Sequence, residues 1–321
     1  MTNTEFPKQL PLPMSVGNLI NIAIQIYRAQ FTLYLGWAMR AALWLVATFW
    51  LWSLMSLLIG AIASVTSDQI GLQVFLIVAS IVIQLIIGSY CISRSIICGA
   101  TISRLSYQTL LQSSETIQLA HQFVRARRRQ LLSATTNVYF TFFMVYIGVG
   151  IIVSVVFYLI GNMFGVNFWS GQLGQTIVVI GIVLFLFSIY AALLFCFARL
   201  FVCDTILAVE DGVAVKKPDN MSWKLTQDNT LRIIAVVLTT GVIMMPSLLL
   251  LQVITHYIFL LYDGAFHYPS SDFIGFWFNF LLGLTVRILC IFVFLPLWKI
   301  LQSTVYYDLK ARKEGIDLQL I

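Results

Sequence analysis

The chain has 321 residues, of which 60% are hydrophobic and only 10% charged, and its mean hydropathy is +0.92. A soluble core cannot hide so much apolar surface, so the composition excludes an ordinary soluble globular protein and predicts that lipid surrounds much of the chain. The net charge of +6 is modest and its basic residues flank apolar segments, which argues against nucleic acid as a partner and for a membrane surface.

The chain begins with a polar segment and an amphipathic one. Residues 1–14 contain three prolines and no apolar core, which predicts a polar N-terminal tail rather than a cleavable signal peptide. In the next segment Ser15 is placed to cap a helix in which Leu19 and Ala23 share one face and Arg28 lies on the other. This pattern predicts an elbow helix lying in the membrane interface.

Six apolar segments of helical length follow along the chain. Each exceeds the roughly 20 residues that a helix needs to cross a bilayer, and backbone amides in lipid find partners only within a helix or a closed barrel. The segments lack the alternation of barrel strands. The sequence therefore predicts an all-α polytopic membrane protein with six transmembrane helices, at 33–63, 72–98, 139–160, 177–201, 233–261 and 274–297.

Two more amphipathic segments precede the third and fifth apolar segments. They cover 114–131 and 218–232, and each is expected to form another elbow helix. In the first, His121 is expected on the solvated face. In the second, Pro218 stands near the helix start, where its missing amide hydrogen costs no hydrogen bond.

The distribution of basic residues predicts the orientation in the membrane. The connections 64–71, 161–175 and 262–273 contain no Lys or Arg, and every basic residue except Arg40 and Arg287 lies on the opposite side of the apolar segments. Positive flanks resist translocation, so both termini are expected in the cytoplasm of a bacterium whose inner membrane holds the protein.

Basic residues also recur at intervals of about 100 residues, which is typical of internal repeats. The two recurring sets are Arg28, Arg125 and Lys224 before the odd-numbered spans, and Arg94, Arg199 and Lys299 after the even-numbered ones. We therefore expect a single membrane domain, 15–308, built of three hairpin repeats and followed by a cytoplasmic tail, 309–321. The approximate repeats are 15–112, 113–212 and 213–308.

Three polar residues within the apolar segments form a candidate intramembrane site. Arg287 costs about 2.5 to 3.5 kcal/mol at the centre of a span, so it is expected to face the helix bundle or a hydrated crevice. Arg40 lies close enough to the cytoplasmic side to extend toward the headgroups. For both arginines, packing within the bundle and a substrate or anion site are open interpretations. Gln84 is expected to form an interhelical hydrogen bond.

No motif in the sequence predicts catalysis or cofactor binding. There is no phosphate-binding glycine loop, zinc-type histidine pair or nucleophile elbow. The five cysteines fall in or beside apolar segments and lack the partners of a metal site. We therefore expect a protein that is not an enzyme, with no catalytic, cofactor or metal site.

Three passages resemble a known family. They are the opening 15–31, the acidic motif 209–212 followed by Ser-Trp-Lys-Leu-Thr at 222–226, and the C-terminal passage 306–318, which begins Tyr-Tyr-Asp-Leu-Lys. Together they resemble the bacterial membrane proteins named after the membrane domain of glycerophosphoryl diester phosphodiesterases. Pro218 departs from the family pattern, which usually has a continuous helix there. The resemblance implies a membrane domain of unassigned biochemical role, because the family's phosphodiesterase activity belongs to a separate soluble barrel that this sequence does not contain.

The favoured hypothesis is a non-enzymatic scaffold or accessory subunit that binds anionic lipids of the cytoplasmic leaflet, a membrane-protein partner or a second copy of itself. Its expected binding surface is a basic collar of Arg28, Arg94, Arg125, Arg127, Arg128, Arg129, Arg199, Lys224 and Lys299. The alternative is a transporter or channel for an anionic or lipid-like solute that uses Arg287 and Arg40. An intramembrane enzyme has the least support, because no base stands beside a nucleophile.

Overall fold

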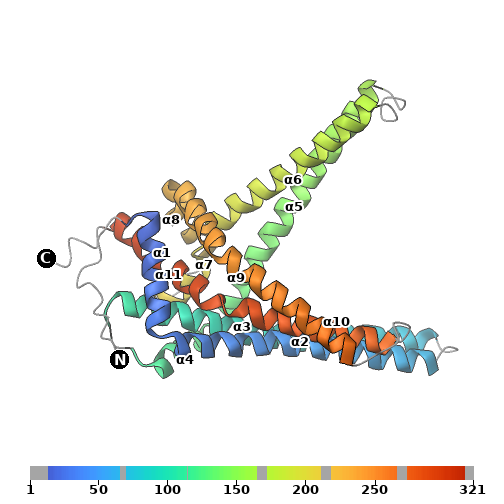
Figure 1. Ribbon diagram of the computed structural model, residues 1–321, viewed down its shortest axis with the longest axis horizontal. Coiled ribbons are helices and arrows are strands. Elements are labelled where there is room, and N and C mark those ends of the chain that lie inside the picture. The colour runs from blue at the N-terminus through green and yellow to red at the C-terminus, as the bar shows by residue number, and fades with distance from the viewer. Residues whose placement is uncertain are drawn as a thin grey trace.

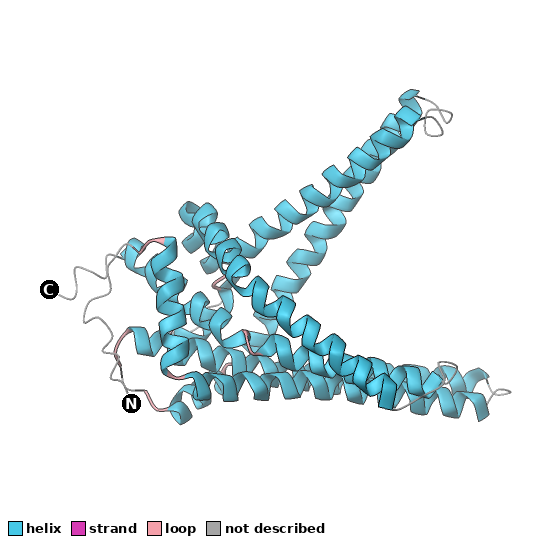
Figure 2. Ribbon diagram, in the orientation of Figure 1, coloured by secondary structure: helices cyan, strands magenta, loops and turns pink. Residues whose placement is uncertain are grey.

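The computed structural model describes residues 14–65, 70–113, 115–164, 172–210, 218–265 and 273–314. All regular structure in these ranges is helical (Figure 2). The predicted tail before Met14, the centres of the three predicted outer connections and the chain after Glu314 lie outside the described residues.

Six long helices carry the apolar segments, and all six are long and apolar enough to cross a membrane. They confirm the predicted all-α fold and identify a multi-pass membrane protein. Several exceed what the hydrocarbon layer needs, because a helix of 41 residues such as α3 extends over about 60 Å. The six are α2 (Phe31–Val65), α3 (Ile70–Leu110), α5 (Arg128–Phe164), α6 (Gln172–Leu200), α9 (Thr230–Ala265) and α10 (Phe273–Phe292).

The long helices form two diverging arms (Figure 1). One arm contains α2, α3, α9 and α10, and the other contains only α5 and α6. In the larger arm, Trp52 Nε1 donates to the carbonyl oxygen of Gln84 at 3.3 Å, and Gln84 Nε2 donates to the carbonyl oxygen of Trp52 at 3.5 Å. The second contact is an interhelical hydrogen bond of the Gln84 side chain, as the sequence predicts.

The sixth apolar segment is broken where the sequence predicts continuous helix. Helix α10 ends at Phe292, and α11 (Leu295–Glu314) begins after a short turn. Pro296 lies in the first turn of α11, where its missing amide hydrogen leaves no helical carbonyl unpaired. The proline therefore allows the chain to change direction without losing a hydrogen bond.

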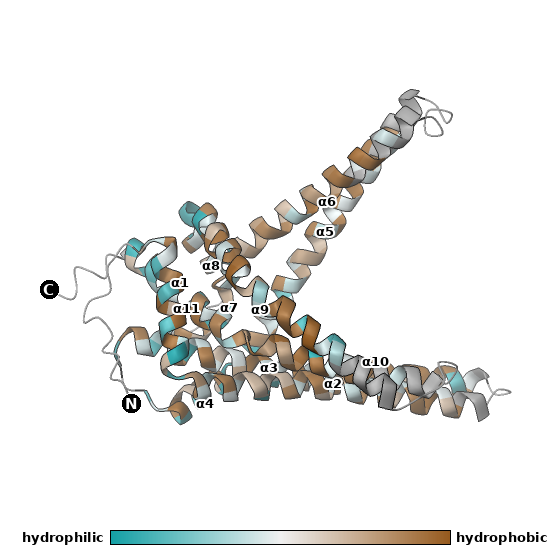
Figure 3. Cartoon of the chain, viewed as in Figure 1, coloured by the Kyte–Doolittle hydropathy of each residue, from teal (hydrophilic) through white to brown (hydrophobic). Residues whose placement is uncertain are grey.

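Shorter helices pack together where the two arms meet (Figure 1). Hydrophilic residues occupy much of α1 and α8, whereas both arms are mostly hydrophobic (Figure 3). We call this end of the molecule the base. Its helices are α1 (Val16–Ala29), α4 (Ile117–Ala126), α7 (Cys203–Val209), α8 (Pro218–Thr226) and α11, together with the 3-10 turn η2 (Gln227–Asn229) and the ends of α2, α3 and α9 that pack against these helices.

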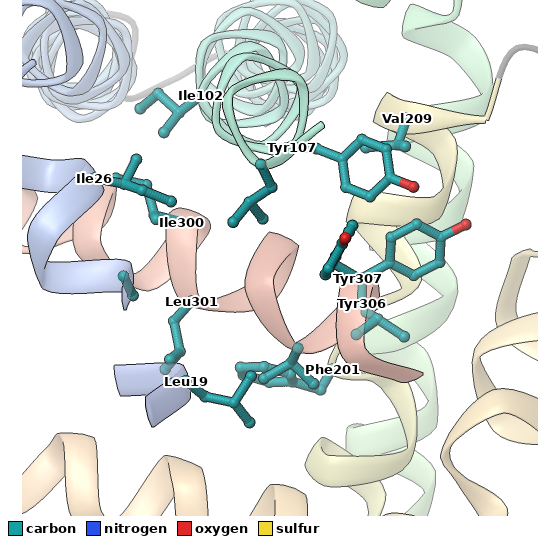
Figure 4. Close-up of a cluster of buried hydrophobic side chains, with 14 of the residues drawn as sticks. Leu19, Ile26, Ile102, Tyr107, Phe201, Val209, Ile300, Leu301, Tyr306 and Tyr307 are labelled. Carbon is teal, nitrogen blue, oxygen red and sulfur yellow. The ribbon is translucent and has the colours of Figure 1, made fainter. Parts of the chain in front are cut away.

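The base has a continuous hydrophobic core (Figure 4). Ser15 caps α1 by accepting a hydrogen bond from the amide of Asn18 at 3.2 Å, as the sequence predicts. Leu19, Ala23 and Ile26 of α1 are buried in this core, and α1 packs against α11 and α9. The prediction that this apolar face lies in the lipid interface is therefore wrong, because neighbouring helices cover it.

The arms contrast with the base in how they use apolar side chains. Phe75 on α3 and Phe187 on α6 are 67% and 69% exposed, and similar residues recur along both arms. Such surfaces suit lipid as the surrounding solvent. The protein thus combines lipid-facing arms with a base whose own core is closed.

Candidate functional site: a basic and aromatic pocket in the base

A pocket of about 250 Å³ lies where α2, α3 and α4 meet in the base. We call it the basic-aromatic pocket, because two arginines, two tryptophans and a histidine surround it. Its lining residues are Trp37, Arg40 and Trp44 from α2, Arg94, Ile97 and Cys98 from α3, and His121 from α4.

Aromatic rings hold both guanidinium groups of the basic-aromatic pocket. Arg40 Cζ lies 4.8 Å from the centre of the Trp37 ring. Arg94 Cζ lies 5.2 Å from the Tyr90 ring and 5.9 Å from the Trp44 ring, and Arg94 Nη2 donates to Tyr90 Oη at 2.8 Å. Cation–π contacts at these distances orient a guanidinium without neutralising its charge.

His121 completes the wall of the basic-aromatic pocket. Its ring centre lies 4.9 Å from that of Trp37, and its Nδ1 lies 3.4 Å from Thr101 Oγ1. Burial lowers the pKa of His121, and the positive charges of Arg125, Arg94 and Arg40 lower it further. The imidazole is therefore neutral at neutral pH and retains a capacity to gain a proton when an anion approaches.

The charge of the basic-aromatic pocket is not balanced by acidic groups. Within the described ranges, neither Arg40 nor Arg94 forms an ion pair with a carboxylate, whereas Arg104, Arg232 and Arg312 in the same base do. Guanidinium groups bind phosphate and carboxylate oxygens through pairs of charge-assisted hydrogen bonds. The arrangement is suited to an anionic group.

The sequence placed Arg40 in an intramembrane site and Arg94 in the basic collar, and the structure brings the two together. It also corrects the expectation for His121, which is partly buried against Trp37 instead of lying on a solvated face. The sequence did contain an indication of one wall of this pocket. Trp37, Arg40 and Trp44 are spaced by three and four residues, so they share one face of α2.

Other residues of the predicted collar divide into exposed and internal ones. The exposed residues are Arg28, Arg125, Arg128, Arg129 and Lys224. Arg127 turns inward instead, with its Cζ 4.1 Å from the Phe123 ring and its Nη1 bonded to the carbonyl oxygens of Leu207, at 3.3 Å, and Glu210. It thereby satisfies carbonyls at the C-terminal end of α7, which a helix cannot satisfy itself.

Arg199 has surroundings similar to those of Arg94. Its Cζ lies 5.2 Å from the ring of Phe195, four residues earlier, as Arg94 lies against Tyr90, and 5.0 Å from the ring of Trp223. Its Nε is buried without a hydrogen-bond partner in the protein. The third member of this set differs, because Lys299 forms an ion pair with Asp204 at 3.1 Å.

Arg287 is exposed on α10 and is not packed within the bundle, so of the two expectations the hydrated crevice stays a prediction. Two residues earlier, Thr285 Oγ1 accepts a hydrogen bond from Trp50 Nε1 at 2.9 Å. Trp50 lies ten residues beyond Arg40 on α2, which is about 15 Å of helix. Arg287 and Arg40 thus lie at different depths and do not form one site.

Sequence reasoning missed several ionic clusters of the base, among them one around Arg104 and one around Glu210. Arg104 is 5% exposed and bonds both carboxylate oxygens of Glu115, at 3.0 and 2.9 Å, and the carbonyl oxygen of Ala208 at 3.2 Å. Glu210 bonds Tyr306 Oη and, at 2.8 Å, Lys310 Nζ. The sequence contained an indication of the second cluster, because its residues lie in two of the passages that carry the family resemblance.

The cluster around Glu210 favours its ionised form. Burial alone would raise the pKa of this carboxyl, but hydrogen bonds from Lys310 and Tyr306, with the charges of Lys310 and Arg127, lower the pKa below its usual value. Across the residues that the structure describes, no group of three or more His, Cys, Asp or Glu side chains is placed to bind a metal ion. Comparison with models of known protein families, with curated proteins and with solved structures found no match.

Proposed function

We propose that this protein is a non-enzymatic membrane scaffold or accessory subunit that binds anionic lipid headgroups through the basic-aromatic pocket. The base faces the cytoplasm of a bacterial cell, and the arms cross the inner membrane. The excess of Lys and Arg on the base side of the apolar helices supports this orientation.

One observation carries the proposal: Arg40 and Arg94 are held by aromatic rings beside a common cavity, with no carboxylate against either in the described part of the chain. Two neighbouring guanidinium groups without a paired carboxylate attract an anion. The phosphate esters of lipid headgroups are the most abundant anions at the membrane surface. The indoles of Trp37 and Trp44 suit the same depth, since tryptophan is enriched at membrane interfaces.

The exposed collar arginines support the same function in a less specific way. Arg125, Arg128 and Arg129 point away from the protein, and each basic residue near an anionic leaflet adds about 1 kcal/mol of attraction. They bring the base to the lipid surface, and the basic-aromatic pocket selects a headgroup. A membrane-protein partner or a second copy of the chain would use the remaining surface of the base.

The transporter alternative has less support. It requires Arg287 and Arg40 along one path, but Arg287 is exposed on α10 and the two lie at different depths of the larger arm. The pocket that Arg40 lines contains Arg94 and His121 instead.

Two further proposals concern origin. The family resemblance stays a proposal that rests on the three passages, and Tyr306, Asp308 and Lys310 of its C-terminal passage make polar contacts in the base. The threefold repeat gains support from the matching aromatic contacts of Arg94 and Arg199.

Lipid retention tests the function directly. The variant Arg40→Gln/Arg94→Gln removes both guanidiniums, and the control Arg28→Gln/Arg129→Gln removes the same charge from exposed positions. Each protein is extracted with its native lipids, and the co-purified lipids are quantified by mass spectrometry. We expect the pocket variant to retain at least about tenfold less phosphatidylglycerol and cardiolipin than the control, because charge-assisted hydrogen bonds contribute about 1.5 to 3 kcal/mol each. Equal retention by the two variants contradicts the proposal.

A further inference from the structure

A second cavity, of about 350 Å³, lies at the junction of the two arms. Helices α3, α5, α6 and α11 contribute to its wall, and most of its lining residues are apolar. It shares no lining residue with the basic-aromatic pocket. Its volume is in the range of small-molecule sites, which are mostly apolar with a few placed polar groups.

Aromatic side chains form one side of this junction cavity. The ring of Phe197 stacks on that of Phe142 with centres 6.3 Å apart and lies 5.8 Å from that of Trp298. The ring of Phe201 meets Trp298 edge-on at 5.5 Å. This wall joins α5, α6 and α11 and offers a continuous apolar surface to a hydrocarbon chain.

An ion pair forms a neutral polar patch in the junction cavity. Lys299 Nζ lies 3.1 Å from Asp204 Oδ2, and both residues line the cavity. Gly99 makes room for the lysine, because a Cβ at that position would lie 3.3 Å from Lys299 Cε. The paired charges cancel, so the patch has no net attraction for an anion or a cation.

Two buried polar atoms on residues that line the junction cavity lack hydrogen-bond partners in the protein. Gln302 is 6% exposed, and its Nε2 donates to the carbonyl oxygen of Phe201 at 2.9 Å, but its Oε1 accepts nothing from the protein. Thr135 Oγ1 is likewise buried and unpartnered. Both residues line the junction cavity. Buried polar groups are normally satisfied, so a free acceptor and a free hydroxyl at one cavity indicate a ligand that bonds them.

We propose that the junction cavity binds a neutral amphiphile that has one hydrocarbon chain and a hydroxyl-bearing head. The hydroxyl donates a hydrogen bond to Gln302 Oε1 and shares a second with Thr135 Oγ1, while the chain lies along the wall of Phe142, Phe197 and Trp298. An ionised carboxylate or phosphate head fits poorly, because Gln302 Oε1 accepts but does not donate and the Lys299–Asp204 pair supplies no net positive charge to balance it. This inference goes beyond the lipid-headgroup function and does not rest on it.

Photolabelling of the full chain in nanodiscs tests the proposal. The probe is a long-chain fatty alcohol with a diazirine in its chain, and the comparison probe is the fatty acid of the same chain length, used at a pH at which it is ionised. Thr135→Val removes the free hydroxyl without changing side-chain volume, and Gln302→Met removes the free acceptor. Thr136→Val is the matched control, because Thr136 is exposed and its hydroxyl already donates to the carbonyl oxygen of Leu132 at 2.8 Å.

We expect the alcohol to label residues of the aromatic wall in preference to the acid. Each of Thr135→Val and Gln302→Met should reduce saturable labelling by about fivefold, as expected for the loss of one hydrogen bond, and Thr136→Val should leave it unchanged. The lipid-binding variant Arg40→Gln/Arg94→Gln should also label normally, so the two proposals fail separately. Equal labelling by alcohol and acid, or equal labelling of the wild type and all three single-site variants, overturns the inference.

Discussion

Asp308 on α11 bonds Arg232 at the start of α9 through a 2.7 Å contact between Oδ2 and Nη1. Asp308 is 1% exposed, and its Oδ1 accepts a hydrogen bond from the amide of Met14 at 2.9 Å. Arg312 completes the cluster, with its Nε 2.9 Å from Asp308 Oδ2. One buried carboxylate thus joins the first described residue, the fifth long helix and the last helix of the base.

Replacing Asp308 should therefore destabilise the base more than replacing any exposed acid. Asp308→Asn leaves Arg232 and Arg312 without their counter-charge, and breaking a buried pair in this way costs about 3 to 5 kcal/mol. We expect an unfolding free energy lower by about 3 kcal/mol, measured by SDS titration of the purified protein in detergent. Asp228→Asn, at an exposed position of η2, is the control and should change it by less than about 0.5 kcal/mol. Similar losses in both variants would argue against a structural role for the cluster.

The buried arginine of α3 should hold α4 and the end of α7 in place. Arg104→Gln removes the bonds to Glu115 and to the Ala208 carbonyl. We expect faster amide hydrogen exchange in α4 and α7, measured by mass spectrometry, because both helices lose an anchoring charge. Exchange in α2 should not change. Glu115→Gln should produce the α4 effect without the full α7 effect, since Arg104 would still reach Ala208. Unaltered exchange in Arg104→Gln would show that packing alone fixes these helices.

Stability should fall in mild acid because of His121. Its folded pKa lies below the usual value of 6.5, so the unfolded state binds a proton more readily than the folded state. The stability that depends on the neutral imidazole is fully present above pH 6.5. It is lost as the pH falls from 6.5 toward the lower pKa of the folded state. The groups that face it are Arg125 on its own helix, Arg94 on α3 and Arg40 on α2. The unfolding temperature should therefore drop as the pH falls below 6.5, the usual pKa of a histidine.

The same measurement has internal controls. His121→Asn should flatten this part of the profile, whereas His256→Asn, at an exposed position of α9, should not. Phosphatidylglycerol should reduce the drop in the wild type, because a bound anion favours the charged imidazole. A profile that is identical in His121→Asn and wild type would contradict the assignment.

The hydrogen bond between α2 and α10 should contribute little to stability, although it lies between two helices of the apolar arm. Trp50 Nε1 donates to Thr285 Oγ1 at 2.9 Å. Interhelical hydrogen bonds in membrane proteins average about 0.6 kcal/mol, because the unfolded helices also find partners. A double-mutant cycle of Trp50→Phe and Thr285→Val, read by SDS titration, should give a coupling energy of about this size. A coupling energy above about 2 kcal/mol would require a further role for the pair.

The sequence alone determined the membrane character, the helical fold and the six spans. These follow from composition and from the length of each apolar segment, because lipid leaves a helix as the simplest way to pair every backbone amide. The cap at Ser15 was also predictable, since it depends only on neighbouring residues. Local patterns of this kind do not require knowledge of which helices meet.

Only the tertiary structure decided where the polar residues act. The sequence pattern of α1 showed an apolar face but not which helices pack against it. Lipid was therefore expected on a face that α11 and α9 cover in the structure. The sequence treated Arg40 and Arg94 as members of different groups, and the contact of α2 with α3 and α4 made them walls of one pocket. Arg287 turned outward for the same reason. Hydropathy fixes the depth of a residue along a helix, but the direction in which its side chain points depends on which face the neighbouring helices cover.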